Sequence, residues 1–284
     1  MEPETNAPLI SVIVASYNAG ETSKRCIGSF AAQKYSHKEL IWMDGESTDK
    51  TVDILTERQS KVTRWTSEKD RGIYHAWNKA IRQSKGEWLC FLGADDYFWS
   101  SQALSNIAPY LETANPPYRV VYGQVAVVTW YGEILEMVGR PWEESKDLFL
   151  HELTIPHQGV FHHRSLFEKY GLFDESYRIT GDYELLLREL KNNDALFVPN
   201  QIITGMQFGG LSSSLKNTFI NINELKRARK QNGFNSFSLP LFWRDIRAKT
   251  RRTFRPVLGE KLTNIIADGY RVIAGKPMIW TKKR

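Results

Sequence analysis

Apolar and polar residues alternate along the N-terminal third of the chain in a pattern that predicts strands separated by helices. Runs rich in β-branched and aromatic residues indicate strands, and stretches whose apolar residues recur every three or four positions indicate helices. By these criteria we expect strands at 9–15, 38–44, 61–68 and 88–92, and helices at 21–33, 47–59 and 73–86. Ser47 or Thr48 is the expected cap of the second helix, and Gly86 is the expected end of the third. This order predicts a mostly parallel sheet with helices on both faces.

The pattern changes near residue 117. The stretch "YRVVYGQVAVVTWYGEILEMVG" predicts two antiparallel strands joined at "WYGE", so the sheet is expected to be mixed. A loop-rich region containing "PHQGVFHH" follows, and its His157 could ligate a metal or contact phosphate, although a lone loop histidine more often does neither. Residues 180–193 then have the spacing of a helix with Asp182 at its start.

Polar side chains follow each of the four predicted strands of the N-terminal half. They are Ser16, Tyr17 and Asn18 after the first strand, Asp44 at the end of the second, Asp70 and Arg71 after the third, and Asp95 and Asp96 after the fourth. Ligands of open α/β sheets bind at the carboxyl ends of the strands, so we expect these residues to share one rim.

The adjacent carboxylates of Asp95 and Asp96 are hard oxygen ligands of the kind that Mg²⁺ or Mn²⁺ takes, with ligand phosphates completing the coordination shell. An isolated Asp-Asp pair can also simply open a turn or cap a helix. The glycine patterns of dinucleotide and P-loop sites are absent from the sequence, which disfavours dinucleotide oxidoreductases and P-loop phosphotransferases. A diphosphate ligand would therefore need a metal and basic side chains.

For each of two further carboxylates, the sequence allows both a chemical role and a structural role. Asp44 could accept the imide N–H of a uracil or a ribose hydroxyl, or it could open the Asp-Gly turn. Asp182 could accept a proton from an attacking hydroxyl, because the helix dipole favours its ionised form, or it could be an ordinary helix cap.

The C-terminal part of the chain differs in composition. The chain has 284 residues and a formal net charge of +6, and the basic excess lies after residue 225. We divide it into an α/β domain, residues 1–212, and a basic, mostly helical extension, residues 213–284. Within the extension, seven basic residues between Arg244 and Lys261 accompany apolar side chains, namely Leu239, Leu241, Phe242, Trp243, Ile246 and Phe254.

This mixture is typical of a helix that lies in an anionic membrane surface. It also fits a helix that packs on the α/β domain with a solvated basic face, and RNA binding is a third alternative. Cys26 and Cys90 form no disulfide framework, and the sequence contains neither an export signal nor a bilayer-spanning run. The expectation is a cytoplasmic protein, free or peripheral at the cytoplasmic face of the inner membrane.

Several motifs together resemble a known family. "SVIVASYNAG", "DGESTDKT", "SEKDRGIYHAWNKAI", "GEWLCFLGADDYF", "HQGVFHHRSLFEKYGLFDESY" and "GDYELLLR" have the order and spacing of the family 2 glycosyltransferases, over about residues 8–210. The resemblance implies the GT-A fold and makes residues 1–212 a catalytic domain. It further implies metal-assisted, inverting transfer of a hexose or N-acetylhexosamine, with a UDP-sugar as the expected donor. The implied acceptor is a hydroxyl of a glycan or lipid-linked molecule in surface polysaccharide biosynthesis.

The resemblance also implies which residues bind the donor. Ser16, Tyr17 and Asn18 look like the first donor-binding turn, and Asp44 resembles the carboxylate that contacts the base. The segment that lines the nucleotide pocket in similar enzymes is represented here by Asp70 and Arg71.

The resemblance gives the remaining carboxylates their roles in metal binding and proton transfer. Asp95 resembles the residue that touches ribose or metal, Asp96 the direct metal ligand, and Asp182 the general base. The motif departs from the family at Gly93, where many relatives have the first Asp of Asp-x-Asp, and at Gly181, where they have Glu before the base.

Two other classes of protein compete with this interpretation. A sugar-phosphate nucleotidyltransferase would also need a metal, a nucleotide and a parallel sheet, but it should have a glycine-rich basic loop where this chain has "ASYNAGETSKR". A non-catalytic nucleotide-sugar-binding protein could retain only the binding turns. The presence of Asp182 together with the Asp95-Asp96 pair argues against the second alternative.

Overall fold

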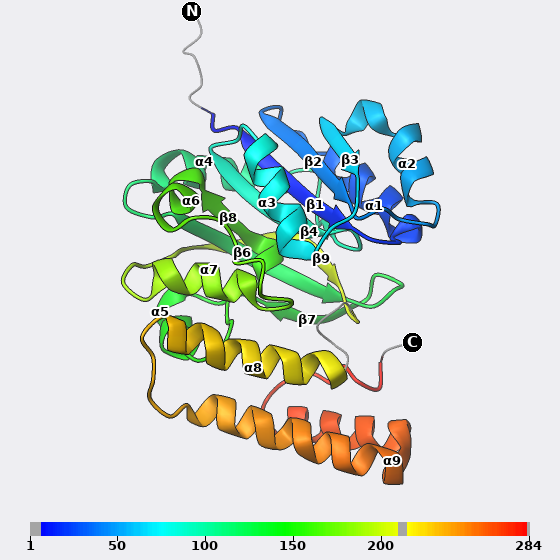
Figure 1. The fold of residues 1–284 in the computed structure, drawn as a ribbon, viewed down its shortest axis with the longest axis vertical. Coiled ribbons are helices and arrows are strands. Elements are labelled where there is room, and N and C mark those ends of the chain that lie inside the picture. Colours follow the sequence, from blue (N-terminus) through cyan, green and yellow to red (C-terminus); the bar gives the residue numbers. More distant parts are fainter. Residues whose placement is uncertain (1–6, 210–214, 283–284) are drawn as a thin grey trace, which may run out of the picture.

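The computed structural model describes residues 7–209 and 215–282, which form a central sheet with helices packed on both of its faces (Figure 1). The strands are β1 (Ile10–Ser16), β2 (Lys38–Asp44), β3 (Arg64–Ser67), β4 (Trp88–Gly93), β5 (Tyr97–Phe98), β6 (Val120–Val128), β7 (Ile134–Val138), β8 (Val160–His163) and β9 (Leu196–Gln207). The helices are α1 (Gly20–Ala31), α2 (Thr51–Glu57), α3 (Ile73–Gln83), α4 (Ala103–Ala114), α5 (Trp142–Phe149), α6 (Arg164–Tyr170), α7 (Gly181–Leu190), α8 (Leu215–Gln231) and α9 (Leu239–Ile273). Short 3₁₀ turns occupy Gln59–Lys61 and His157–Gly159.

The sheet is mixed, as the sequence predicts. Its strand order is β3-β2-β1-β4-β8-β6-β9-β5, and β7 pairs with β6 outside this path. Strands β3, β2, β1 and β4 run parallel, while β8 is antiparallel to both β4 and β6. The predicted hairpin around "WYGE" is confirmed, because β6 and β7 pair antiparallel across it.

The side chains of β1 show how one strand supplies two cores. Successive residues of a strand point to opposite faces of the sheet. Val12 and Val14 join the apolar cluster that contains residues of α1 and α4, whereas Ile13 joins the cluster that contains residues of α3 and α7. Both faces of the parallel strands are therefore buried, which explains their continuous apolar sequences.

Two expected helix boundaries are wrong. Helix α2 begins at Thr51, because Ser47 and Thr48 bond instead to the turns after β1 and β2. Helix α3 ends before Gly86, whose N–H donates to Ser11 Oγ at 2.8 Å. A Cβ at position 86 would lie 2.3 Å from that oxygen, so the glycine permits close approach to β1 rather than ending a helix.

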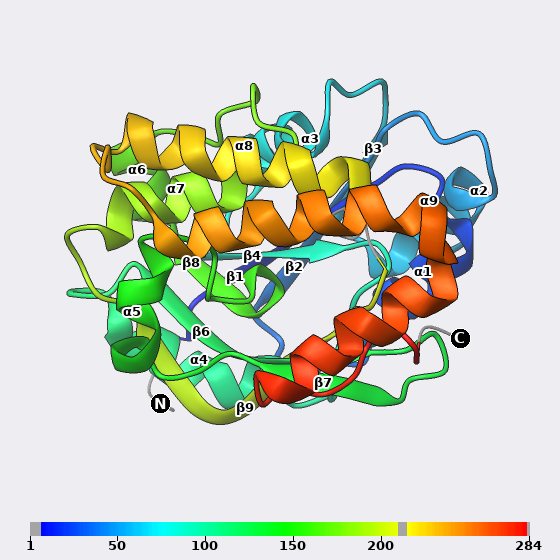
Figure 2. The ribbon, with the colours of Figure 1, turned by 90° about the horizontal axis from the view of Figure 1, so that it is seen from below.

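The C-terminal helices lie below the sheet in Figure 1 and run side by side across that face in Figure 2. Helix α8 packs on α7, and α9 packs on α8. Gly259, with a φ of 73°, divides α9 into two arms. The predicted boundary at residue 212 lies outside the described residues, so this division stays a prediction. Among the residues that the structure describes, no helix is both long and apolar enough to cross a bilayer.

Candidate active site

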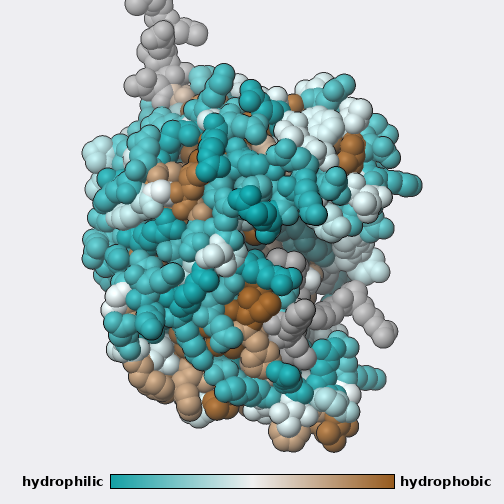
Figure 3. Space-filling model, in the orientation of Figure 1, coloured by the Kyte–Doolittle hydropathy of each residue, from teal (hydrophilic) through white to brown (hydrophobic). Residues whose placement is uncertain are grey.

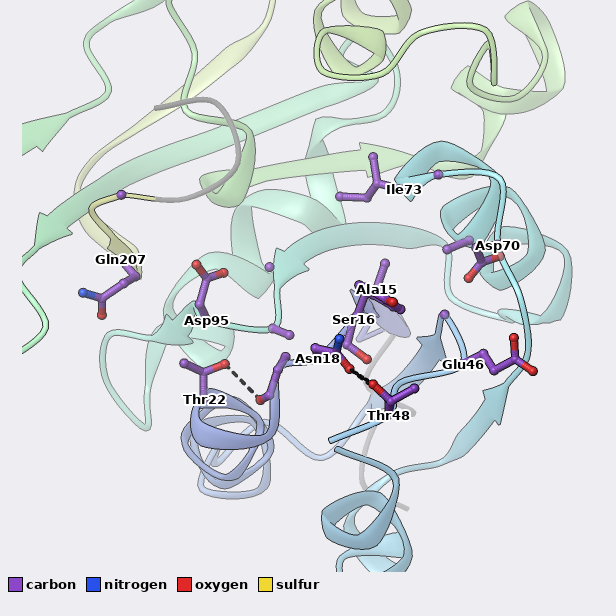
Figure 4. A pocket seen from close by; sticks show the side chains of 18 of the residues that line it. Ala15, Ser16, Asn18, Thr22, Glu46, Thr48, Asp70, Ile73, Asp95 and Gln207 are labelled. Atoms are coloured by element: carbon purple, nitrogen blue, oxygen red, sulfur yellow. Dashed lines mark hydrogen bonds between the residues drawn. The ribbon is translucent and has the colours of Figure 1, made fainter. Parts of the chain in front are cut away.

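A cavity of about 1310 Å³ opens at the carboxyl ends of the central parallel strands (Figure 4). It is bounded by the turns after β1, β2 and β4, by the first residues of α3, and by the β6–β7 hairpin with the end of β9. Among the site residues expected from the sequence, those that line it are Ser16, Tyr17, Asn18, Asp70 and Asp95. The rim predicted from strand alternation therefore encloses a real cavity.

The turn after β1 is fixed by hydrogen bonds to the loop after β2. Asn18 has a φ of 53°, a left-handed conformation that Asn tolerates well. Its Oδ1 accepts the N–H of Thr48 at 2.9 Å, and its own N–H donates to Ser47 Oγ at 2.8 Å. The neighbouring Tyr17 is 67% exposed and faces the cavity. The turn thus presents an aromatic ring on a well-anchored backbone.

Asp44 is fully buried and does not line the cavity. Its carboxylate accepts hydrogen bonds from the hydroxyls of Ser16, Ser47 and Ser67 at 2.8, 2.5 and 2.7 Å, and from the Ser47 N–H at 2.9 Å. These four bonds tie the ends of three strands together. The structure therefore gives Asp44 the turn-holding role that the sequence left open, and the expected direct contact with a base has no free acceptor position here.

Asp70 and Arg71 are separated by the structure although they are adjacent in sequence. Asp70 lines the cavity, with Lys79 Nζ at 2.7 Å and His75 Nδ1 at 2.8 Å from its Oδ1. Arg71 does not line it; its side chain is 71% exposed and pairs with Glu175. The expectation that Arg71 lines the nucleotide pocket is therefore not met in this conformation.

The two carboxylates of the Asp pair differ in their access to the cavity. Asp95 projects into the cavity, whereas Asp96 is only 3% exposed and is not among the lining residues. The Asp96 carboxylate accepts the N–H of Gly93 at 3.0 Å and that of Gln207 at 3.2 Å. Burial, reinforced by the charge of Asp95, raises the pKa of Asp96 to about 8, and burial also raises the pKa of Asp95.

Gly93 explains one departure from the family pattern. A Cβ at this position would lie 2.6 Å from Asp95 Oδ1 and 2.8 Å from Asp96 Oδ2. Both carboxylates thus occupy the space that a side chain at position 93 would need. The glycine is required by the way in which the pair folds back on the end of β4.

The Asp pair suits a divalent cation in its donor chemistry and its electrostatics. Two adjacent carboxylates whose pKa values are both raised would be stabilised by a positive charge. No third His, Cys, Asp or Glu joins them in a metal-binding group within the described ranges. Mg²⁺ and Mn²⁺ need only one or two protein carboxylates when substrate phosphates supply further oxygens. Asp95, which faces the cavity, is the better placed ligand, and the Asp96 carboxylate is buried and bonded to the N–H groups of Gly93 and Gln207.

Asp182 lies in the first turn of α7, beside the start of α3. Its Oδ1 accepts the Tyr183 N–H at 2.9 Å and lies 3.3 Å from the Tyr74 hydroxyl. Tyr74 directly follows Ile73, which lines the cavity. Neither Tyr74 nor Asp182 is among the residues that line the cavity. Burial raises its pKa to about 6.

Gly181 is also explained by its surroundings. A Cβ at this position would come within 2.8 Å of the Tyr74 ring. The glutamate that many relatives have here would collide with that ring unless Tyr74 moved. The absence of Glu before Asp182 thus follows from the close packing of α7 on α3.

His157 belongs to the aromatic core. It is 4% exposed and stacks against the rings of Trp77 and Phe91, with His162 beside it. Burial holds the pKa of His157 well below its usual range, and burial lowers that of His162 to about 4, so both rings are neutral. A metal or phosphate role for His157 is not supported.

Several cavity residues were not identified from the sequence. Gln207 at the end of β9 lines the cavity beside Asp95, and Glu46 lines it near Asp70. Trp130 in the β6–β7 hairpin is also a lining residue. Arg25 of α1 donates from Nη2 to the Asp95 carbonyl at 2.7 Å and to Gln207 Oε1 at 3.0 Å. Only contacts between distant segments reveal these residues, because none belongs to a recognisable motif.

Comparison with known proteins assigns the family. The model of "Glycosyl transferase family 2" matches residues 11–171. The chain belongs to this family. A curated relative from Mycobacterium bovis, "PGL/p-HBAD biosynthesis glycosyltransferase", is 32% identical over 232 residues, which cover 78% of this chain and 84% of the relative.

Solved glycosyltransferase structures share the fold of this family 2 member. The mannosyltransferase PcManGT from Pyrobaculum calidifontis, in complex with GDP-Man and Mn²⁺, aligns with a TM-score of 0.64 at 17% identity, covering 98% of this chain and 84% of that one. TarS from S. aureus, in complex with UDP-GlcNAc, aligns with a TM-score of 0.60 at 17% identity, covering 77% of this chain and 66% of that one. The predicted GT-A fold is confirmed.

Proposed function

We propose that this family 2 member is an inverting glycosyltransferase that uses a nucleotide diphosphate sugar and a divalent cation. The observation that carries the proposal is a carboxylate, Asp95, that faces the cavity, with a second carboxylate, Asp182, buried outside the cavity lining. The pKa of Asp182 is raised to about 6 by burial, and its carboxylate lies 3.3 Å from the hydroxyl of Tyr74, the residue next to the cavity-lining Ile73. A cation-binding carboxylate and a base near neutral pH are the two groups that the reaction needs.

In the proposed reaction, an acceptor hydroxyl attacks the anomeric carbon as the bond from that carbon to the donor phosphate breaks. The nucleoside diphosphate leaves with the bonding electrons, and Asp182 takes the proton of the hydroxyl. A bound Mg²⁺ or Mn²⁺ would supply Lewis-acid stabilisation of the leaving diphosphate. Asp95 would hold that ion, and Asp96 would keep Asp95 in place. The acceptor must displace or pass the Tyr74 ring to reach Asp182.

The other end of the cavity is the proposed base site. Asp70 and Glu46 face this end in Figure 4, opposite Asp95 and Gln207. Uracil is the proposed base, because a carboxylate accepts its imide N–H. Asp70 replaces Asp44 in this role, since the hydrogen bonds of Asp44 are internal. Binding of UDP compared with GDP, measured by calorimetry, tests the choice.

The proposed acceptor is a glycan or a lipid-linked molecule, and the transferred group a hexose or N-acetylhexosamine. The name of the mycobacterial relative, which refers to PGL/p-HBAD biosynthesis, supports a biosynthetic role. Action at the cytoplasmic face of a membrane, with the basic extension at an anionic surface, is part of this proposal.

The proposal can be tested by measuring metal-dependent hydrolysis of a panel of nucleotide sugars. The variant Asp182→Asn serves as the control. We expect release of nucleoside diphosphate from one donor, with strong dependence on Mg²⁺ or Mn²⁺. Pyrophosphate formation from a sugar phosphate and a nucleoside triphosphate would identify a nucleotidyltransferase instead. Donor binding without any turnover, with or without acceptors, would identify a non-catalytic binding protein.

A further inference from the structure

The second arm of α9 buries three polar side chains and exposes its large apolar ones. Thr263, Asn264 and Asp268 face the protein and are 9% exposed or less. The exposed aliphatic side chains of this arm are Leu262, Ile265, Ile266, Val272 and Ile273, with exposed fractions from 44% to 88%. A helix that faces water should have the opposite pattern. The outer face of this arm is therefore built for an apolar environment.

The first arm carries a matching stripe. Leu241 and Ala248 are buried and point inward. Positions spaced three and four apart on the opposite side are exposed. These are Leu239, Phe242, Trp243, Ile246, Phe254 and Val257.

Both arms lie on one side of the molecule. Figure 2, which views the molecule from below, shows them as the nearest helices, and Figure 3 shows apolar side chains gathered along the lower margin. The apolar residues of the two stripes together form what we call the α9 face. It is far larger than the scattered exposed apolar residues that are normal on a soluble domain.

The charge around the α9 face is strongly positive. Residues 239–282 contain ten Lys or Arg and three Asp or Glu. Asp245 pairs with Lys226 and Lys249, while Asp268 accepts hydrogen bonds from the N–H groups of residues 279–281. Exposed cations of the arms include Arg247, Arg252 and Lys261. An anionic surface complements this charge, whereas a second copy would bring two positive faces together.

Two side-chain contacts connect the C-terminal part of the chain to the elements that border the cavity. Arg271 on the second arm pairs with Glu136 of β7 at 2.6 Å, and β7 belongs to the hairpin that borders the cavity. Trp280 packs edge-on against Phe208, a cavity-lining residue, at 5.7 Å between ring centroids. Docking of α9 would therefore hold the cavity at a fixed position relative to the docked surface.

From these observations we infer that the α9 face docks on an anionic lipid bilayer. Its apolar stripes enter the boundary between headgroups and acyl chains, and the flanking cations contact lipid phosphates. The inference rests on the proposed function in one respect: docking would bring the active-site cavity to a lipid-linked acceptor. Docking itself requires no catalysis.

Flotation of the full chain with vesicles tests the inference. We expect flotation with vesicles of phosphatidylcholine and phosphatidylglycerol, weaker flotation with phosphatidylcholine alone, and loss of binding as salt is raised. Lys249→Gln, Arg252→Gln and Lys261→Gln together should lower partitioning by roughly a hundredfold, because each cation near an anionic surface contributes about fivefold. Absence of flotation by the unaltered chain at low salt would overturn the inference.

Serine substitutions test whether the exposed apolar side chains of α9 contribute to vesicle binding. Trp243→Ser with Ile273→Ser should abolish flotation, whereas Tyr110→Ser, an exposed aromatic on α4, should leave it unchanged. Donor hydrolysis without vesicles should be normal in all of these variants, so failure of docking is distinguishable from failure of the proposed reaction. Sedimentation showing that the unaltered chain dimerises through these residues would assign the face to a second copy and overturn the lipid inference.

Discussion

At the scale of single residues, the surroundings of Asp182 set the predicted chemistry. The side chain is held by one backbone N–H and lies near the Tyr74 hydroxyl, and burial weakens its acidity. Asp182→Asn keeps the shape and removes the base. We expect turnover to fall by about 10²- to 10⁴-fold while the donor dissociation constant changes little. Steady-state kinetics and calorimetry check this, and unchanged turnover would eliminate Asp182 as the base.

The raised pKa of Asp182 predicts a pH dependence. Only the ionised carboxylate can accept the proton, so activity is lost as pH falls through about 6. Turnover should rise about tenfold per pH unit below that value and level off above it. The residual activity of Asp182→Asn should not show this limb. If the unaltered enzyme and Asp182→Asn lose activity over the same pH range, the titrating group is not Asp182.

Substitutions of Asp95 and Asp96 should have different effects, the first on donor binding and the second on stability. Asp95→Asn should abolish metal-dependent donor binding and leave the melting temperature nearly unchanged, because its side chain faces the cavity. Asp96→Ala should destabilise the fold, since the buried N–H groups of Gly93 and Gln207 each lose a partner at a cost of about 1–3 kcal/mol. Calorimetry with and without Mn²⁺ and thermal melting separate the two effects. Metal-dependent binding that survives in Asp95→Asn would restore Asp96 as the direct ligand.

At the scale of elements, α8 of the extension holds the loop that leads into α7. Glu224 of α8 accepts the N–H groups of Arg178, Ile179 and Thr180 at 2.7 to 2.9 Å. This loop positions the start of α7 and therefore Asp182. The extension thus contributes to the site from outside the predicted catalytic domain.

Glu224→Gln tests this contact. The amide of Gln would place an N–H against at least one of the three backbone donors, so we expect a loss of about 1–3 kcal/mol in stability. Thermal melting should show a drop of several degrees, with reduced turnover. Glu112→Gln, at an exposed position of α4, is the matched control and should change neither. Equal melting of both variants would contradict the proposed anchoring.

At the scale of the whole molecule, the C-terminal tail connects the extension to the cavity. The Asp268 carboxylate accepts the N–H groups of Ile279, Trp280 and Thr281 at 2.8 to 3.0 Å, which holds Trp280 against Phe208. Asp268→Asn should release this tail. We expect amide hydrogen exchange of residues 279–281 to accelerate by about tenfold or more, because each lost bond costs about 1 kcal/mol. Asp245→Asn is the control, and equal protection in both proteins would contradict the tether.

The features that the sequence predicts correctly are those that depend on local patterns of apolar and polar residues. Strand alternation was sufficient for the mixed sheet, and strand ends were sufficient to bring Ser16, Asp70 and Asp95 to one cavity. Helix boundaries at Ser47 and Gly86 were wrong because their partners, Asp44 and Ser11, are distant in sequence. No local pattern reveals those contacts.

The sequence by itself determined the alternation of strands and helices, and with it the fold and the carboxylates at its rim, because the spacing of apolar residues fixes which faces are buried. Only the tertiary structure decided which carboxylates are accessible: Asp95 faces the cavity while Asp96 and Asp44 bond internally. It also decided that α9 turns its apolar side outward, since the burial of a helix face depends on what packs against it. Such choices depend on contacts between segments that local periodicity does not encode.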